Sequence, residues 1–221
     1  MRMGQLRLAD QLMLMLLTPD GKVISGGYTD LLLGGAVLSD LILRGRIGIA
    51  GQGELVKTGR VVVRSPAPVG DELLDTALQK LIDKPGARPS SVVRALVKRQ
   101  TVLDRLTTRK VVTVSRRRVL GLFPVTYWLA VDGRPAAQAR HELQRVVDGG
   151  ARPGPESAAL VLLLQAARIL HKVVPTNDRK AQRARTKDLT RGNWATPEIR
   201  KALQDVAAAV TTGVANINIG E

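Results

Sequence analysis

The sequence predicts a mainly α-helical fold, on three observations. Apolar residues recur at helical spacing over several long segments, and Pro, Gly, Ser and Asp mark the ends of those segments. Segments that alternate like strands are short and come in neighbouring pairs. Strands and helices do not alternate along the chain as a parallel sheet requires. We therefore expect packed helices with a few short strand pairs.

The individual elements follow from apolar spacing, capping residues and breaks in the pattern. The expected helices are Ala9–Leu17, Asp30–Arg44, Asp71–Ile82, Ser90 or Ser91 to Thr107, Pro135–Val147, Pro155–Val173 and Pro197–Val210. The expected strands are Ile47–Ile49 with Arg60–Arg64, and Val111–Val114 with Val119–Phe123 around a turn at Ser115–Arg118. No repeat or boundary divides the chain, so we predict a single domain over residues 1–221 with its core over about 6–212.

The segment Leu31–Ile49 is the most informative part of the chain. It is apolar at nearly every helical-spaced position, so its helix should be buried on most of its surface. Thr29 and Asp30 can cap its start, and Gly45 can end it in a left-handed conformation. The glycine pair at 34–35 costs about 1 kcal/mol per residue relative to Ala, which predicts close packing at that point.

Charge gives the strongest indication of a partner. The chain carries 34 Lys and Arg against 19 Asp and Glu, a net charge of +15. This excess favours an anionic partner, which can be nucleic acid, acidic lipid or an acidic protein. Arg predominates, and its planar guanidinium can bond two phosphate oxygens at once. A solvated basic surface without a specific partner stays open as the alternative.

The sequence argues against catalysis and against bound metals or cofactors. There is no Cys, which excludes disulfides, thiolate zinc sites and cysteine nucleophiles. His141 and His171 each stand alone on an expected helix, without a second ligand at metal-binding spacing. No nucleophile elbow, P-loop or dinucleotide fingerprint is present in the sequence. We predict that the protein is not an enzyme and holds no cofactor.

No targeting or membrane-spanning segment is expected. Leu12–Leu17 is a short apolar run, but Asp10 interrupts it on its N-terminal side. No small-residue cleavage site follows the run. No run reaches about 18 consecutive apolar residues. We expect a cytoplasmic protein that binds peripherally to the inner face of the membrane.

Four passages, in the right order, resemble a bacterial member of the Golgi phosphoprotein 3 family. They are LRLADQLMLMLLTPDGK, LLLGGAVLSDLILRGRI, APVGDELLDTALQKL, and LTTRKVV with the apolar hairpin that follows. The resemblance extends over about residues 6–210. Its most specific passage is Pro68–Asp75, where Gly70 permits a turn and Asp71 can cap the next helix. We favour a structural role for Asp71 and Asp75 over a catalytic one.

The resemblance implies helices around a central buried helical bundle, one protruding β-hairpin, and no known enzymatic activity. Eukaryotic members bind phosphatidylinositol 4-phosphate on Golgi membranes and the cytosolic tails of glycosyltransferases, so the resemblance implies membrane and phospholipid binding here. In lipid-binding members, a Trp before the second helix, an Arg in that helix and two basic residues on a later helix contact the headgroup. The matching positions in this sequence are Ser25, Gly34, Leu96 and Arg99.

Arg99 and its neighbour Lys98 form the first candidate site for a lipid phosphate or another anion. At helical spacing Arg99 shares a face with apolar residues, where a charge is costly unless it is paired or reaches an edge. One interpretation is an anion-binding Arg at the rim of a pocket. The other is an internal ion pair with Asp40 or Asp75, or a side chain that reaches solvent past the apolar stripe.

The expected hairpin is the second candidate. The basic residues at its expected tip are Arg116, Arg117 and Arg118, and the residues that follow include Val119, Leu120, Leu122, Phe123, Tyr127 and Trp128. Basic, apolar and aromatic residues together are typical of an interfacial anchor. We therefore expect the tip to contact membrane, and the resemblance associates this hairpin with membrane contact and self-association. The alternative, which we prefer for Trp128, is that the aromatics belong to the core beneath a solvated basic turn.

A third basic feature is the polar segment 177–193, which we expect to be a solvated loop that adds attraction for anionic lipid. Partial helix is compatible with the spacing of Arg183 and Lys187. The basic residues of this segment are Arg179, Lys180, Arg183, Arg185, Lys187 and Arg191.

The main rival to membrane binding is a winged-helix-like nucleic-acid-binding protein. A helix with Arg94, Lys98 and Arg105, followed by a basic hairpin, would place the helix in the major groove and the hairpin on phosphate. The net charge fits this rival. Against it, Pro85–Pro89 is a stiff break where a tight helix-turn-helix is needed. An anionic phospholipid membrane is thus the favoured partner over nucleic acid, and homo-oligomerisation and a protein client are left open.

Overall fold

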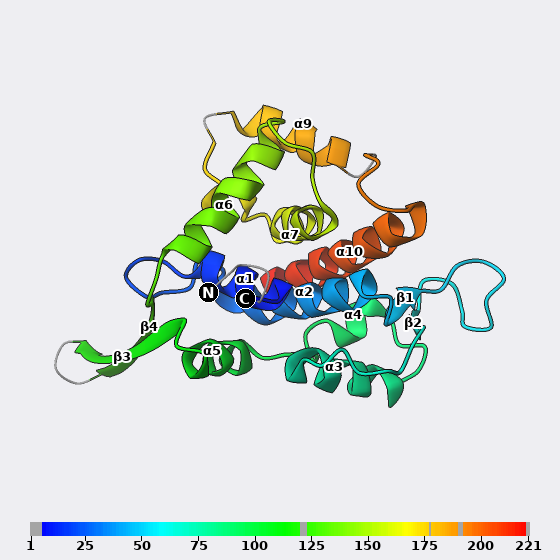
Figure 1. Ribbon diagram of the computed structural model, residues 1–221, viewed down its shortest axis with the longest axis horizontal. Coiled ribbons are helices and arrows are strands. Elements are labelled where there is room, and N and C mark those ends of the chain that lie inside the picture. The colour runs from blue at the N-terminus through cyan, green and yellow to red at the C-terminus, as the bar shows by residue number, and fades with distance from the viewer. Residues whose placement is uncertain (1–5, 120–122, 177, 190–191, 220–221) are drawn as a thin grey trace.

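The computed structural model describes residues 6–119, 123–176, 178–189 and 192–219, and its fold is mainly α-helical, as predicted (Figure 1). The helices are α1 (Leu8–Leu16), the 3₁₀ turn η2 (Gly26–Tyr28), α2 (Thr29–Leu43), α3 (Glu72–Ile82), α4 (Pro89–Val92), α5 (Arg99–Thr108), α6 (Arg134–Val147), α7 (Pro155–Ala166), α8 (Leu170–Val173), α9 (Arg179–Leu189) and α10 (Pro197–Ile219). The strands are β1 (Ile47–Ile49), β2 (Val61–Val63), β3 (Val112–Val119) and β4 (Phe123–Ala130). β1 pairs antiparallel with β2, and β3 pairs antiparallel with β4.

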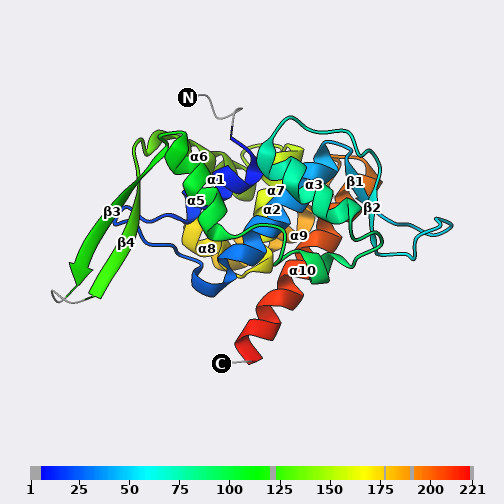
Figure 2. The same cartoon turned by 90° about the horizontal axis from the view of Figure 1, so that it is seen from below.

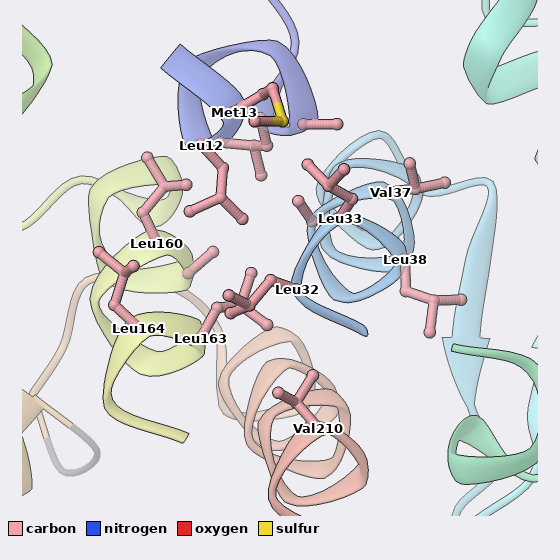
Figure 3. Close-up of a cluster of buried hydrophobic side chains, with 14 of the residues drawn as sticks. Leu12, Met13, Leu32, Leu33, Val37, Leu38, Leu160, Leu163, Leu164 and Val210 are labelled. Atoms are coloured by element: carbon pink, nitrogen blue, oxygen red, sulfur yellow. The ribbon is translucent and has the colours of Figure 1, made fainter. Parts of the chain in front are cut away.

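Helix α2 lies at the centre of the hydrophobic core. Helices α1, α7 and α10 pack around it, and their leucines meet between the helices, as Figure 3 shows for Leu12 of α1, Leu32 of α2 and Leu163 of α7. Leu32 and Leu33 have no solvent-accessible surface. The apolar composition of α2 therefore follows from burial on nearly all sides.

The glycine pair of α2 sits where two neighbours approach its backbone closely. A β-carbon at Gly34 would overlap the backbone carbonyl of Val93, next to α4. A β-carbon at Gly35 would lie 2.6 Å from Leu163 of α7 and 3.0 Å from Val210 of α10. The expected close packing is confirmed, and it explains why two poor helix formers stand in the central helix.

One stretch, Gly26–Leu43, is long and apolar enough to cross a membrane by length and composition. No uninterrupted apolar run marks this stretch in the sequence, because Asp and Gly residues interrupt it. In the fold, 72% of this stretch is buried inside the molecule, where it forms the core helix.

Glycine ends α2 as expected. Gly45 has a φ of 65°, and its N–H donates to Ile42 O at 2.9 Å while the N–H of Arg46 donates to Leu41 O at 2.9 Å. These two bonds form a Schellman motif, which satisfies the last carbonyls of the helix.

The single helix expected from Ser90 or Ser91 to Thr107 is wrong. The chain forms α4, leaves the helix and starts again as α5 at Arg99. Asp30 of α2 accepts the N–H of Arg99 at 2.7 Å, and Lys80 of α3 donates to Leu96 O at 3.0 Å. Partners from other helices thus satisfy backbone groups that the interrupted helix leaves free.

Three other boundaries differ from the sequence-based expectation. The helix expected over Pro155–Val173 is interrupted after α7 at Arg168, which has a φ of 58°. The segment 177–193, expected as a solvated loop with partial helix compatible with its spacing, contains the full helix α9. Helix α10 continues past Val210 to Ile219.

The β3–β4 hairpin is longer than expected, and its turn lies elsewhere. Arg116, Arg117 and Arg118 belong to β3 and pair with Thr126, Val125 and Pro124. Val119 pairs with Phe123, so both strands continue past the three arginines. The expected turn at Ser115–Arg118 is therefore wrong. An exposed two-stranded ribbon can carry charged residues along its length, so a run of Arg does not require a turn. The hairpin protrudes from the helices at one end of the molecule (Figure 2).

Candidate functional site

A cleft lies where the starts of α2 and α5 meet, and we call it the α2–α5 cleft. It has a volume of about 400 Å³ and is lined by Gly26, Gly27, Thr29, Asp30, Lys98, Arg99 and Gln100. Asp30 holds its two sides together, since it accepts the backbone N–H of Arg99 and pairs with Lys98 Nζ at 3.4 Å. The carboxylate therefore caps α5 and offsets one of the two cations of the cleft.

The guanidinium of Arg99 extends from this cleft towards the hairpin. Its central carbon lies 5.9 Å from the centroid of the Trp128 ring on β4, a distance typical of a cation–π contact. Among the ion pairs of the described residues, none involves Arg99. The expected alternative of an ion pair with Asp40 or Asp75 is wrong.

The two carboxylates proposed for that ion pair have other partners. Asp40 pairs with Arg44 at 2.6 Å, and its other oxygen accepts the N–H of Leu8. Asp75 accepts the backbone N–H groups of Val69, Gly70 and Asp71 and so holds the turn before α3. Arg99 is consequently available to an anion at the edge of the core.

One face of the hairpin continues the basic surface that begins at Arg99. Directly opposed residues of an antiparallel pair lie on the same face, and so do alternate residues along a strand. Val114 pairs with Trp128 and Arg116 with Thr126, so Val114, Arg116, Arg118 and Trp128 share one face, which we call the Trp128 face. Arg116 and Arg118 are exposed, and Val114 is 41% exposed. Trp128 is half-buried and packs against the core, as preferred from the sequence.

The remaining hairpin residues of the predicted site are described only in part. Leu120 and Leu122 lie outside the described residues. Val119 and Phe123 end and begin their strands, and Arg117 lies within β3, but their side chains fall outside the described part. The membrane-contact role predicted for Val119, Leu120, Leu122 and Phe123 therefore stays a prediction.

A buried ionic cluster, which the sequence did not predict, joins α1, α3 and α5. Arg105 Nε donates to Asp10 Oδ1 at 3.1 Å, and its Nη2 donates to Asp71 Oδ2 at 2.6 Å. Arg7 donates to Asp71 Oδ2 at 2.9 Å, and Arg109 lies 3.5 Å from Asp10. Its signals in the sequence were Asp10 within an apolar helix and Asp71 in the specific passage before α3.

The two carboxylates of this cluster respond to it in opposite ways. Burial raises the pKa of Asp10 above its usual value, against the positive charge of Arg105. Burial alone would also raise the pKa of Asp71, but the hydrogen bonds from Arg105 and Arg7 outweigh it and hold that pKa below its usual value. Asp71 Oδ1 also accepts the N–H of Leu74 at 3.4 Å, so the expected cap of α3 is confirmed.

The same cluster removes the basis of the winged-helix interpretation. Arg105 points to Asp10 and Asp71, and Arg94 precedes α5 rather than lying on it. The exposed residues of α5 include Asp104, which binds Gln100 at 2.7 Å. The helix before the hairpin thus presents no row of free cations to a major groove.

Comparison with known proteins places the chain in one family. The model of the Golgi phosphoprotein 3 (GPP34) family matches residues 8–206, which include every element from α1 to the middle of α10. The chain belongs to the GPP34 family. No curated protein matches it. The family is associated with lipid binding and peripheral Golgi membranes and is not a known family of enzymes, so membership suggests a phosphoinositide-binding role.

Of the four positions that match headgroup contacts in lipid-binding GPP34 members, Arg99 alone lines the α2–α5 cleft. Ser25 is buried, and its hydroxyl lies 2.9 Å from that of Thr29. Leu96 is buried in the core. Gly34 lies one turn beyond Asp30 on α2 and is held against Val93, so no side chain fits there.

Proposed function

We propose that this GPP34 member is a peripheral membrane protein that binds the phosphate of an anionic phospholipid at the α2–α5 cleft. The observation that carries the proposal is the position of Arg99, which is free of ion pairs among the described residues and lies over Trp128. A guanidinium with open donors at a cleft of headgroup size is suited to a phosphate ester.

The Trp128 face of the hairpin supports the proposal as a second contact. Arg116 and Arg118 are exposed along it, and the hairpin extends away from the helices (Figure 2). Each basic residue near an anionic surface contributes about 1 kcal/mol. With the hairpin against the membrane, these two residues add electrostatic attraction while Arg99 contacts a headgroup.

The proposed ligand class is anionic phospholipid in general rather than one phosphoinositide. Three of the four positions matching the family's headgroup contacts hold Ser25, Gly34 and Leu96, which leaves the cleft with two cations, Lys98 and Arg99. Because Asp30 offsets Lys98, the cleft can neutralise one phosphate charge but offers few groups to distinguish where a sugar ring carries a second phosphate.

Sedimentation with lipid vesicles tests the proposal. Vesicles of phosphatidylcholine are mixed with phosphatidylinositol 4-phosphate, phosphatidylinositol or cardiolipin at equal total charge. We expect binding to all three acidic mixtures and little to phosphatidylcholine alone. Arg99→Ala should lower the binding at least about fivefold, and Arg116→Ala with Arg118→Ala about thirtyfold, at about 1 kcal/mol per charge.

The matched control removes one exposed charge far from the hairpin. The control is Lys84→Ala, and Lys84 is an exposed residue that follows α3. It lies near Ala87, whose carbonyl accepts the N–H of Val61 on β2. Figure 2 shows β2 and the hairpin at opposite ends of the molecule. The binding of Lys84→Ala should equal that of the parent. If Arg99→Ala bound vesicles as the parent does but melted earlier, the site would be structural. If random duplex DNA bound more tightly than acidic vesicles at matched salt, the membrane would be the wrong partner.

A further inference from the structure

A second basic hollow, which we call the α7–α9 pocket, lies between the end of α7, α8, α9 and α10. Its volume is about 480 Å³, and its basic lining residues are Arg168, His171, Arg179 and Arg183. None of the described residues that line it is Asp or Glu. It shares no lining residue with the α2–α5 cleft.

The three guanidiniums of this pocket are not paired with any carboxylate that the structure describes. Within the described ranges, no ion pair involves Arg168, Arg179 or Arg183. The nearest acidic residue along the chain is Asp178, and its Oδ1 instead accepts the N–H of Ala181 at 2.8 Å, which caps α9. Like charges around one hollow repel one another, and a bound anion relieves that repulsion.

The pKa of His171 reflects the burial and the excess positive charge around the pocket. Burial, and then the positive charges of Arg179, Lys172 and Arg183, lower the pKa of its imidazole below the usual value. The ring is therefore neutral at pH 7 and presents one N–H donor. A bound anion would raise the pKa of His171 again, because its negative charge opposes the positive charges of Arg179, Lys172 and Arg183.

Arg168 is held in a backbone conformation that favours glycine. Its φ is 58°, its N–H donates to Gln165 O, and the N–H of Ile169 donates to Leu164 O, so it occupies the left-handed position of a Schellman motif. Helices α2 and α6 end in the same motif with Gly45 and Gly149. This conformation costs a side chain more than it costs glycine, so Arg168 can be replaced by glycine without loss of a favourable backbone geometry.

We propose that the α7–α9 pocket binds a small phosphorylated ligand, with its phosphate among Arg168, Arg179 and Arg183. The guanidiniums supply charge-assisted hydrogen bonds, and the imidazole of His171 adds a donor from α8. The pocket volume accommodates a ligand larger than phosphate itself, such as a phosphorylated sugar or a glycerol phosphate group. The shared chemistry is a phosphate monoester or diphosphate, either free or at the end of a lipid.

The decisive variant is Arg168→Gly, because it removes the guanidinium and relieves the backbone at once. It should melt at the same temperature as the parent or higher. Its affinity for pyrophosphate, measured by calorimetry at constant ionic strength, should fall roughly tenfold or more. Lys110→Gly is the matched control, since Lys110 has a φ of 58° at the end of α5 but lines neither site. It should keep the affinity of the parent.

The two histidines provide a second readout. Proton NMR of the parent should show that pyrophosphate raises the pKa of His171 and leaves the ring signals of His141 on α6 unchanged. Unchanged pyrophosphate affinity in Arg168→Gly, or equal shifts at both histidines, would overturn the proposal. Equal binding of sulfate and pyrophosphate by both glycine variants would show nonspecific charge alone and overturn it as well.

Two further binding experiments distinguish a free phosphorylated ligand from a lipid headgroup. Glycerol 3-phosphate is titrated as the free ligand, and vesicles with phosphatidic acid present the same group on a lipid. If the ligand is free, Arg168→Gly loses glycerol 3-phosphate binding and keeps vesicle binding. If it is a lipid, Arg168→Gly also loses phosphatidic acid vesicles. Loss of vesicle binding in Arg99→Ala concerns the other cleft, so either proposal can fail without the other.

Discussion

Gly34 shows how a single missing side chain sets the spacing of the core. Its backbone touches the carbonyl of Val93, and that carbonyl belongs to main chain that leads from α4 to α5. We predict that Gly34→Ala destabilises the fold by at least about 3 kcal/mol, because a backbone group cannot move aside as a side chain can. Denaturation by urea measures the loss. Gly133→Ala, which meets no atom within 4 Å, should lose little stability and serves as the control.

Asp71 gives a prediction with a pH dependence. Asp71→Asn keeps an acceptor for the cap of α3 but loses the negative charge that binds Arg105 and Arg7. At pH 7 it should be less stable than the parent by about 3 kcal/mol, because the partner charges stay half-buried without it. Asp104→Asn, at an exposed position of α5, should change stability little.

The sign of the pH effect follows from the lowered pKa of Asp71. Such a group stabilises the folded state above its unfolded pKa, near the usual 3.8, and this contribution is lost as the pH falls through the folded pKa. The stability difference between parent and Asp71→Asn should therefore persist from pH 7 to pH 5 and shrink below about pH 4. A difference that stayed constant down to pH 2 would contradict the assignment. The raised pKa of Asp10 acts in both proteins, so it largely cancels in this comparison.

At the scale of elements, the hairpin can be shortened without touching the core. Val112 is buried, whereas Thr113 and Val114 are exposed, so β3 leaves the core after Val112 while β4 still contacts the core at Trp128. Trp128 donates its N–H to Gly21 O, away from β3, so the adjacent pair of Ser115 with Tyr127 carries the hydrogen bonds between the strands. A two-residue Asn-Gly turn fits such a pair.

We predict that replacing residues 116–126 by Asn-Gly leaves stability within about 1 kcal/mol of the parent and abolishes most binding to acidic vesicles. Thermal unfolding and vesicle sedimentation measure the two effects. Retained vesicle binding would show that the hairpin is not a membrane contact. A large loss of stability would show that the distal ribbon packs on the helices.

Helix ends are predictable from the sequence where the residues that cap or terminate the helix are its neighbours in the chain. Asp71 caps α3 from the position before it, and Gly45 ends α2 from within its own motif. The break before α5 was not predictable, because Asp30, 69 positions earlier, provides the cap. Nor was the end of α7, where an Arg rather than a Gly adopts the left-handed conformation.

At the scale of the whole molecule, the net charge of +15 should govern membrane affinity. Exposed charges are screened over about 10 Å at 0.1 M salt and about 3 Å at 1 M. We predict that binding to acidic vesicles falls more than tenfold between 0.05 and 0.5 M sodium chloride. Vesicle sedimentation across this range measures the slope. Affinity that is insensitive to salt would indicate insertion of apolar residues as the main contribution.

The sequence predicts two residues of the candidate cleft, Lys98 and Arg99, but not the elements that surround them. Arg99 and Lys98 do lie together, because they stand side by side in the chain. The position of Arg99 over Trp128, and of both residues beside η2 in one cleft, depends on packing between segments far apart in sequence, and no local pattern encodes it. The α7–α9 pocket is not predictable for the same reason, since the sequence favours a solvated loop over most of α9 and one continuous helix over α7 and α8.

The packing of α10 on α2 also fixes an order of events during synthesis. Leu31 and Gly35 of α2 are covered by Gly213, Val206 and Val210 of α10, which the ribosome adds more than 150 residues later. At about 5–20 residues per second, roughly 10–30 s pass before the partner helix is made. Throughout that interval the face of α2 that α10 covers has no partner, within a stretch long and apolar enough to cross a membrane by length and composition. Until α10 covers it, this apolar face makes the nascent chain prone to aggregation.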